Sequence, residues 1–260
     1  MTDFLEAPTG GLVFGGGSLV PPFLASYSNS SGTSGSTRSV TAPSGIQAGD
    51  LLFAFCTSAN DEPFFGSDVG FTAVADGGGY TPSWTQLYKR TVNKTDTFGD
   101  FPTQGHVEGC SQCFWKVANA NDVAASQFRF NDGESSSLKT ICIVRVVGSG
   151  GIDAYYSDQV VWTHDGPTDP DHREVQAPDI TTTRPACLLL FHGSCIWRYQ
   201  DNNPYASDNY FTANFDNATA LQDEVVQRVG YDIVYPTGSI GTDYIAYTSY
   251  DETIAPVGYF

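Results

Sequence analysis

Three stretches of this chain are apolar on both faces of any strand that they form. They are Leu51–Cys56, Thr140–Val147 and Cys187–Phe191. A strand of this kind needs a hydrophobic layer on each side, because water covers neither face well. The second layer can come from loops, from an N-terminal arm or from another subunit. We therefore expect self-association, with a large monomer and covering loops as the alternative.

Short strand-like segments separated by Gly, Pro, Asn and Asp continue along the chain from Val40. Phe128 and Phe130 alternate with polar residues, which is the period of a half-buried strand. Only residues 218–229 (ATALQDEVVQRV) have helical spacing, and this segment suits a strand equally well. The sequence predicts an all-β fold, a jelly-roll-like antiparallel β-sandwich of two four-stranded sheets.

The chain twice places Ala-Pro ahead of a polar stretch and a solid apolar strand. The two copies are TAPSGIQAGDLLFAF at residues 41–55 and QAPDITTTRPACLLLF at residues 176–191. Proline cannot donate to a sheet ladder, so each pair predicts an edge or a turn before a central strand. The spacing indicates two related halves of one sandwich.

The N-terminal part differs in composition from the remainder. Residues 1–25 are apolar and rich in Gly, which indicates either an extended arm that packs on a neighbour or the first edge strand of the domain. Residues 26–39 (SYSNSSGTSGSTRS) are typical of a polar linker or long loop. We expect an arm and linker at 1–39 and a single β-sandwich domain at 40–260.

The formal net charge of −17 disfavours binding to nucleic acid and to anionic membranes, because both carry negative charge. No apolar run approaches the ~18–20 residues of a membrane helix. The first residues lack the basic region of a signal peptide, and Gly and Pro interrupt their apolar stretch, so we expect folding in a cytoplasm. The six cysteines are then expected to be thiols.

Four segments together resemble a known family. They are VTAPSGIQAGDLLFAF (40–55), PSWTQLYKR (82–90), CFWKVANANDVAASQFRF (113–130) and APDITTTRPACLLLF (177–191). This succession is similar to β-sandwich domains of structural proteins from tailed bacteriophages and prophages. Ser83 stands where that family usually has Gly before Trp-Thr. The resemblance is a pattern of strands and not a catalytic signature.

The resemblance implies a non-enzymatic virion protein, assembled in the host cytoplasm as a capsid decoration or tail-associated component. We expect a homotrimer that contacts a major capsid or tail protein. An apolar arm would dock it, through Leu12, Val13, Phe14, Leu19, Val20 and Phe23. The alternative is a carbohydrate-binding attachment domain for host glycans. Its expected sugar-facing residues are Tyr199, Tyr205 and Tyr210, because exposed tyrosines stack on sugars.

Two groups of residues are weak candidates for metal binding. His106, Cys110 and Cys113 supply three ligands of a zinc type without a clear fourth, so a pair of free thiols is favoured over zinc or a disulfide. The acidic loop with Asp165, Asp169 and Asp171 lacks EF-hand spacing, and a solvated turn is favoured over calcium. We expect no resident metal or cofactor.

Catalytic motifs are lacking in the sequence. There is no Gly-x-Ser-x-Gly elbow, and FGGGS at residues 14–18 lacks the Lys-Ser/Thr end of a phosphate loop. His192 and Cys195 share one strand-like segment, but their spacing does not suit a catalytic dyad. Acidic pairs are uninformative because the chain has 29 Asp and Glu. We expect no enzymatic activity.

Overall fold

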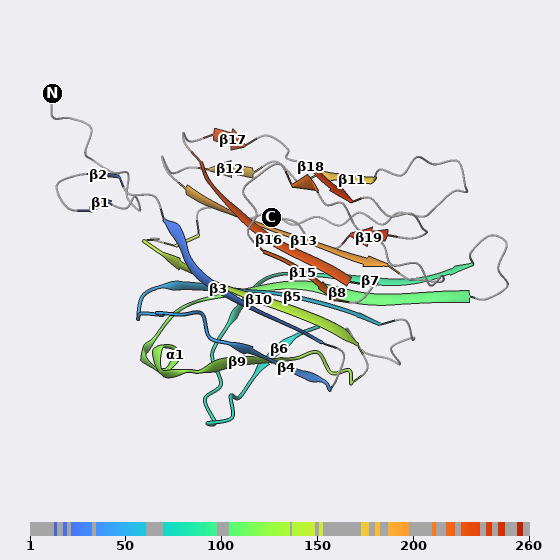
Figure 1. Cartoon of the computed structure of the whole chain (residues 1–260), viewed down its shortest axis with the longest axis horizontal. Helices are drawn as coiled ribbons and strands as arrows, with labels where there is room; N and C mark the ends of the chain where they lie inside the picture. Colours follow the sequence, from blue (N-terminus) through green and yellow to red (C-terminus); the bar gives the residue numbers. More distant parts are fainter. Residues whose placement is uncertain are drawn as a thin grey trace.

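The fold is all-β with antiparallel pairing throughout the described part of the chain (Figure 1). The computed structural model describes residues 13–14, 18–19, 22–32, 35–60, 70–97, 104–135, 137–148, 151–152, 173–176, 180–182, 187–197, 210–211, 217–221, 225–234, 238–240, 244–247 and 254–256. These residues form nineteen strands and one five-residue helix. The predicted all-β antiparallel sandwich is confirmed.

The largest sheet has five strands in the order β3-β10-β5-β8-β7. The two most apolar segments, β5 and β10, lie side by side within it, where both faces are buried. The strand bounds are β3 Phe23–Gly32, β5 Leu51–Asn60, β7 Thr85–Thr97, β8 Gln104–Val117 and β10 Leu138–Val147. The polar strands β3 and β7 form its edges, where water can reach them.

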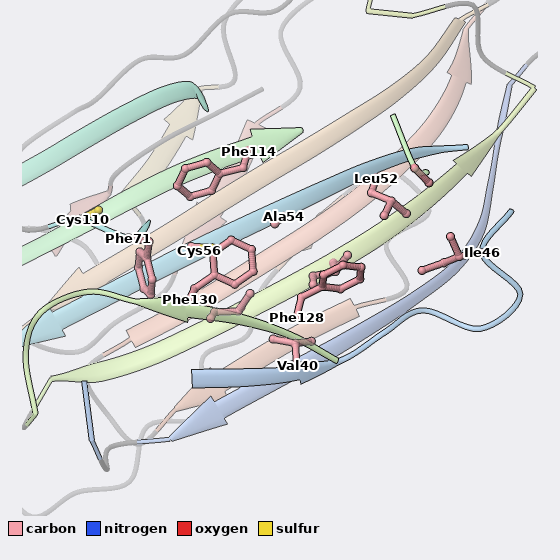
Figure 2. Packing of buried hydrophobic residues seen from close by; sticks show 13 residues of the cluster. Val40, Ile46, Leu52, Ala54, Cys56, Phe71, Cys110, Phe114, Phe128 and Phe130 are labelled. Atoms are coloured by element: carbon pink, nitrogen blue, oxygen red, sulfur yellow. The ribbon is translucent and has the colours of Figure 1, made fainter. Parts of the chain in front are cut away.

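A three-stranded sheet covers one face of this sheet (Figure 2). It consists of β4 (Thr37–Thr41), β9 (Gln127–Asn131) and β6 (Thr72–Val74), with β9 in the middle. Phe128 and Phe130 of β9 are fully buried in the core between the two sheets, as their alternation predicted. Their partners from the larger sheet include Leu52, Ala54, Cys56, Phe114, Ile141 and Ile143.

The connectivity of these eight strands, β3 to β10, is that of a jelly roll. Counted along the chain, strand one pairs with eight, two with seven and three with six. An antiparallel ribbon that is wound on itself gives this nested pairing. One departure occurs at the innermost pair, because β6 joins β9 while β7 stays with β8. The predicted jelly-roll character is therefore present within residues 23–147.

The other face of the five-stranded sheet packs on a four-stranded sheet in the order β15-β16-β13-β19. Leu188 and Leu190 of β13 contact a second core cluster, which contains Leu51, Phe53, Phe55, Tyr88, Cys113, Cys142, Val144 and Val146. Burying one apolar side chain contributes about 1.5–3 kcal/mol, so this cluster matters on the scale of the whole folding free energy. Both faces of β5 and β10 are thus covered within one chain.

Strand pairing in the second half repeats that of the first. In the first half β4 pairs with β9 and β9 with β6; in the second half β11 pairs with β18 and β18 with β14. Likewise the order β10-β5-β8-β7 recurs as β19-β13-β16-β15. The bounds are β11 Arg173–Gln176, β13 Cys187–Trp197, β14 Tyr210–Phe211, β15 Asn217–Leu221, β16 Val225–Val234, β18 Tyr244–Tyr247 and β19 Ile254–Pro256.

The Ala-Pro pairs occupy equivalent places in the two repeats. Ala42-Pro43 follows β4 and precedes β5, and Ala177-Pro178 follows β11 and precedes β13. Each passage leads from a three-stranded sheet to an inner strand of a larger sheet. Between β11 and β13, β12 (Ile180–Thr182) pairs with β17 (Gly238–Ile240). At the corresponding place in the first repeat, Gly49 N donates to Ala118 O (2.9 Å).

The repeats are stacked back to back, with the five-stranded and four-stranded sheets at the centre and the three-stranded sheets outside (Figure 1). The two central sheets have five and four strands, where two four-stranded sheets were expected. Each half instead repeats the pairing pattern of two sheets. The second layer that the apolar strands required is supplied by the second repeat, so β5 and β10 give no reason to invoke another subunit.

The structure corrects one local expectation, decides another and adds one element that was not expected. The stretch 26–39, expected to be a linker or loop, contains most of β3 and the start of β4, held by antiparallel ladders to β10 and β9. The described residues of the ambiguous segment 218–229 lie in β15 and β16. A short helix, α1 (Ala120–Ala124), was not expected; Asn119 and Asp122 form a capping box at its start.

Candidate docking surface

The expected docking residues fall partly on described strands. Val13 and Phe14 form β1 (Val13–Phe14), and Leu19 ends β2 (Ser18–Leu19), which pairs with β1 in the register Val13↔Leu19. Figure 1 places this hairpin outside the stacked sheets. Phe23 is the first residue of β3. Leu12 and Val20 lie outside the described residues. Docking by this segment stays a prediction.

Two large hydrophobic side chains are exposed on β3, at the edge of the five-stranded sheet. Phe23 is 46% exposed and Tyr27 is 42% exposed. A register shift opposite Arg145 and Val146 interrupts the strand between them, so the two aromatic rings lie on opposite faces of the sheet edge. Leu24, between them in the chain, packs against the second core cluster. The edge therefore presents an aromatic ring on each side.

The strand β3 itself carries no charged residue. No Asp, Glu, Lys or Arg occurs from residue 7 to residue 37, although the whole chain has a net charge of −17. The first charged residue after this stretch is Arg38, whose Nε donates to Ser30 Oγ (2.8 Å). Ser26 and Ser28 donate their hydroxyls to the carbonyls of Ser44 and Thr41. These bonds fix one face of β3 to β4 and to the segment after it.

Gly49 and Asp50, from the first segment of the resemblance (40–55), have a structural role. Gly49 has a φ of +98°, a conformation that costs other residues strain. The Asp50 carboxylate then accepts from Gln47 N (2.7 Å) and from Arg145 Nε (2.6 Å). Both side chains of the ion pair are largely buried. The motif therefore ties the passage from β4 to β5 onto β10.

Lys116, from the third segment of the resemblance (113–130), also has a structural role. Lys116 Nζ lies 2.7 Å from Asp122 Oδ1, and both side chains are buried. Tyr80 donates its hydroxyl to the same carboxylate oxygen (2.9 Å). Lys116 Nζ lies 5.6 Å from the ring centroids of Tyr80 and Trp84, within cation–π range. This network holds α1 and the segment before β7 against the end of the sheet.

The candidate zinc ligands do not converge. Cys110 and Cys113 both belong to β8, but they lie on opposite faces of the sheet: Cys110 packs into the core with Phe128 and Phe130, and Cys113 packs into the second core cluster. Residues three apart in a regular strand point to opposite sides, so they cannot bind one ion together. Both are buried free thiols, and burial raises the pKa of Cys110 to about 12. His106 lies on β8, without a described side chain.

The remaining site candidates lie mostly beyond the described residues. Asp165, Asp169 and Asp171 fall outside them, as do Tyr199 and Tyr205. Tyr210 begins β14, where the backbone alone is described. Among the described side chains, no three His, Cys, Asp or Glu residues gather as metal ligands would.

A buried histidine lies between the two repeats, a position that the sequence did not predict. His192 of β13 is fully buried; Tyr88 OH is hydrogen-bonded to its Nδ1, and Thr57 Oγ1 lies 3.5 Å from its Nε2. Its ring is also 4.9 Å from that of Phe55. Burial lowers the pKa of His192 to about 3 and raises that of Tyr88, so both are neutral.

A buried charge cluster lies at the turn between β9 and β10. Lys139 Nζ lies 3.3 Å from Asp132 Oδ1 and donates to Glu134 O (2.7 Å). Ser137 Oγ donates to Asp132 Oδ2 (2.5 Å). Burial raises the pKa of Asp132 and lowers that of Lys139, and the attraction between the two charges opposes both shifts. The hydrogen bonds are satisfied locally, which indicates a structural clamp on the turn from β9 to β10.

Comparisons of the chain with family models, with curated protein sequences and with solved structures found no match. In the part of the chain that the structure describes, no helix has the length and apolar character to span a bilayer.

Proposed function

We propose that this protein is a non-enzymatic structural component of a bacteriophage particle, a capsid decoration or tail-associated protein. It docks on the particle through the uncharged N-terminal stretch that leads into β3. The proposal rests on the resemblance of four segments to phage structural proteins and on what those segments do here. Their motif residues, Gly49, Asp50 and Lys116, all serve the framework of the first repeat.

The observation that carries the docking proposal is the position of the uncharged stretch. It ends in an edge strand with exposed Phe23 and Tyr27, and it contains the expected docking residues. On a strongly acidic chain, an uncharged apolar segment is the part whose transfer out of water costs the least free energy. Several copies on one lattice would strengthen a weak individual contact through avidity. The expected trimer remains a prediction.

Deleting residues 1–21 tests the proposal, because the deletion removes most of the docking segment and leaves β3 intact. We expect occupancy on assembled particles to fall at least tenfold. The circular dichroism spectrum and melting temperature of the purified protein should stay unchanged, since no described core residue is lost. Normal occupancy of particles by the truncated protein would refute docking through this segment.

The carbohydrate-binding alternative predicts a different result. Full-length protein would bind particular host polysaccharides on a glycan array, and Tyr199→Ala, Tyr205→Ala or Tyr210→Ala would abolish that binding. The deletion of residues 1–21 would then leave glycan binding intact. This outcome would assign attachment, and not docking, as the main role.

A further inference from the structure

We propose that Lys139 and Asp132 react with each other to form an intramolecular amide bond, which links the turn after β9 covalently to β10. The amine nitrogen of Lys139 bonds to the carboxyl carbon of Asp132, and one water molecule leaves. The reaction is a self-modification of the folded chain and consumes no other reactant. It is carried by the arrangement of three side chains, those of Lys139, Asp132 and Ser137.

The two reacting groups are held together and away from water. Lys139 Nζ lies 3.3 Å from Asp132 Oδ1, and the two side chains are 1% and 0% exposed. Asp132 directly follows β9 of the three-stranded sheet, and Lys139 is the second residue of β10 in the five-stranded sheet. Fixing two reactants at contact distance removes the entropic part of the barrier to their reaction. A dry site also protects the product from hydrolysis.

The surroundings favour the uncharged forms that amide formation requires. An ammonium has no lone pair with which to attack, so the lysine must first lose a proton. Burial lowers the pKa of Lys139 and raises that of Asp132. The Arg38 cation lowers the pKa of Lys139 further, while the Asp132 and Glu134 carboxylates oppose the shift. The net shifts of both groups are toward an amine and a carboxylic acid.

Ser137 connects the two groups for proton transfer. Lys139 Nζ donates to Ser137 Oγ (2.5 Å), and Ser137 Oγ donates to Asp132 Oδ2 (2.5 Å). Along this path a proton of the ammonium passes to Ser137 while the serine proton passes to Oδ2. The result is a neutral amine beside a neutral carboxylic acid, with the serine hydroxyl restored. Ser137 thereby acts as a proton relay between the reacting atoms.

The remaining steps balance at the carboxyl carbon of Asp132. The Nζ lone pair forms the bond to Cγ, and the electron pair of the carbonyl moves to Oδ1. Glu134 N donates to Oδ1 (3.1 Å), so it stabilises this negative charge as an oxyanion-hole donor does. A second proton passes from Nζ through Ser137 to Oδ2, which leaves as water while Oδ1 re-forms the carbonyl. One hydrogen remains on the amide nitrogen.

A second buried lysine–aspartate pair provides an internal comparison. Lys116 Nζ lies 2.7 Å from Asp122 Oδ1, and the Tyr80 hydroxyl also bridges these two groups. The difference lies around the lysine: Lys116 Nζ is 5.6 Å from the centroids of the Tyr80 and Trp84 rings, which stabilise an ammonium. Lys139 has the Arg38 cation nearby instead. We therefore expect Lys116 and Asp122 to remain an ion pair.

Tryptic digestion and mass spectrometry of the purified full-length protein test the proposal. Trypsin cleaves after free lysine and arginine but not after a lysine whose amine is part of an amide. The unmodified chain releases residues 130–139, whereas the amide yields residues 130–145, lighter than their sequence by one water molecule. Fragmentation of this peptide should release no products from backbone breaks between residues 132 and 139, because the amide closes a ring. We expect this form in most molecules, with normal cleavage after Lys116.

Two variants test the roles of the side chains. Ser137→Ala removes the relay and keeps both reactants, so the amide should form more slowly by roughly a hundredfold during cell-free synthesis. Lys139→Arg keeps a cation and a tryptic site but removes the attacking amine. It should show the full peptide mass and cleavage after residue 139. Formation of the amide at the wild-type rate in Ser137→Ala would rule out the relay.

Loss of water from Asp132 alone is the alternative that the experiment separates. Asp132 precedes Gly133, whose backbone nitrogen can close a ring on the same carboxyl carbon; here Gly133 N donates to Asn131 Oδ1 (2.6 Å). That product would leave cleavage after Lys139 intact, regain water in mild alkali and persist in Lys139→Arg. Finding it, or finding only residues 130–139 at full mass, would overturn the inference. Neither result depends on the proposed function, which is tested on particles.

Discussion

Replacing His192 by phenylalanine tests how the polar patch between the two repeats contributes to stability. Phenylalanine keeps an aromatic ring beside Phe55, whose centroid lies 4.9 Å from that of the imidazole. The Tyr88 hydroxyl, however, loses its partner at His192 Nδ1 in a fully buried place. Removing one hydrogen-bond partner of a buried polar group costs about 1–3 kcal/mol. At neutral pH we therefore expect the variant to be less stable by roughly 2 kcal/mol.

The difference should reverse at acidic pH. The pKa of His192 is lowered by burial from 6.5 to about 3, so below pH 6.5 the unfolded chain takes up a proton that the folded chain does not. The contribution of His192 to stability is then complete above pH 6.5 and is lost at about 1.4 kcal/mol per pH unit as the pH falls. The histidine loses its advantage of about 2 kcal/mol near pH 5, and below that pH His192→Phe should be the more stable protein.

Urea unfolding of both proteins between about pH 7.5 and 4.5 measures this difference directly. Carboxylates titrate in the same range, but they are common to both proteins and cancel in the comparison. Thr57→Val is the matched control, because it alters the same patch at Nε2 of His192 without a titrating group. Its difference from wild type should not depend on pH. A constant gap between wild type and His192→Phe across the range would refute the reasoning.

Three further predictions concern the framework of the first repeat. Lys116→Met should destabilise the protein by about 3–5 kcal/mol in urea unfolding, because Asp122 stays buried without its cation. The double variant with Asp122→Asn should recover part of this loss of stability. If it recovers none, the ion pair is not the cause. Gly49→Ala should lower the free energy of unfolding by about 1–2 kcal/mol, because Gly49 has a φ of +98°. Gly77→Ala, at an exposed turn with room for a Cβ, should lower it much less. Equal losses would show that backbone strain is not responsible. The buried thiol of Cys110, with a pKa of about 12, should resist alkylation at pH 8 in the native protein and react after unfolding, and rapid native modification would contradict its burial.

The sequence predicted much of the fold because its strands carry a strong local signal. Phe128 and Phe130 alternate with polar residues and are buried in β9, as expected. Two segments that are apolar on both faces form the inner strands β5 and β10, because both of their faces need a hydrophobic cover. Ala-Pro marked the passage between sheets in both halves. These features depend on neighbouring residues and on the period of a strand.

The candidate sites were less predictable, because they depend on which face a residue occupies and on what packs against it. The Cys-x2-Cys spacing drew attention to a metal site, but β8 turns Cys110 and Cys113 to opposite sides of the sheet. His192 was considered only for a dyad with Cys195; its burial beside Tyr88 arises from contact between strands about one hundred residues apart. The polar composition of 26–39 concealed β3, since an edge strand does not need a hydrophobic alternation as regular as that of a core strand.

The all-β class, the central strands and the two Ala-Pro passages follow from alternation and backbone chemistry along a few residues, so they can be predicted without the fold. The cover on the second apolar face of β5 and β10, which is the chain's own second repeat, becomes known from the three-dimensional packing alone. The same holds for the position of the uncharged strand β3 at a sheet edge. The physical reason is that hydrophobic burial requires a covering surface but does not specify which surface, and this choice is made by packing over long sequence distances.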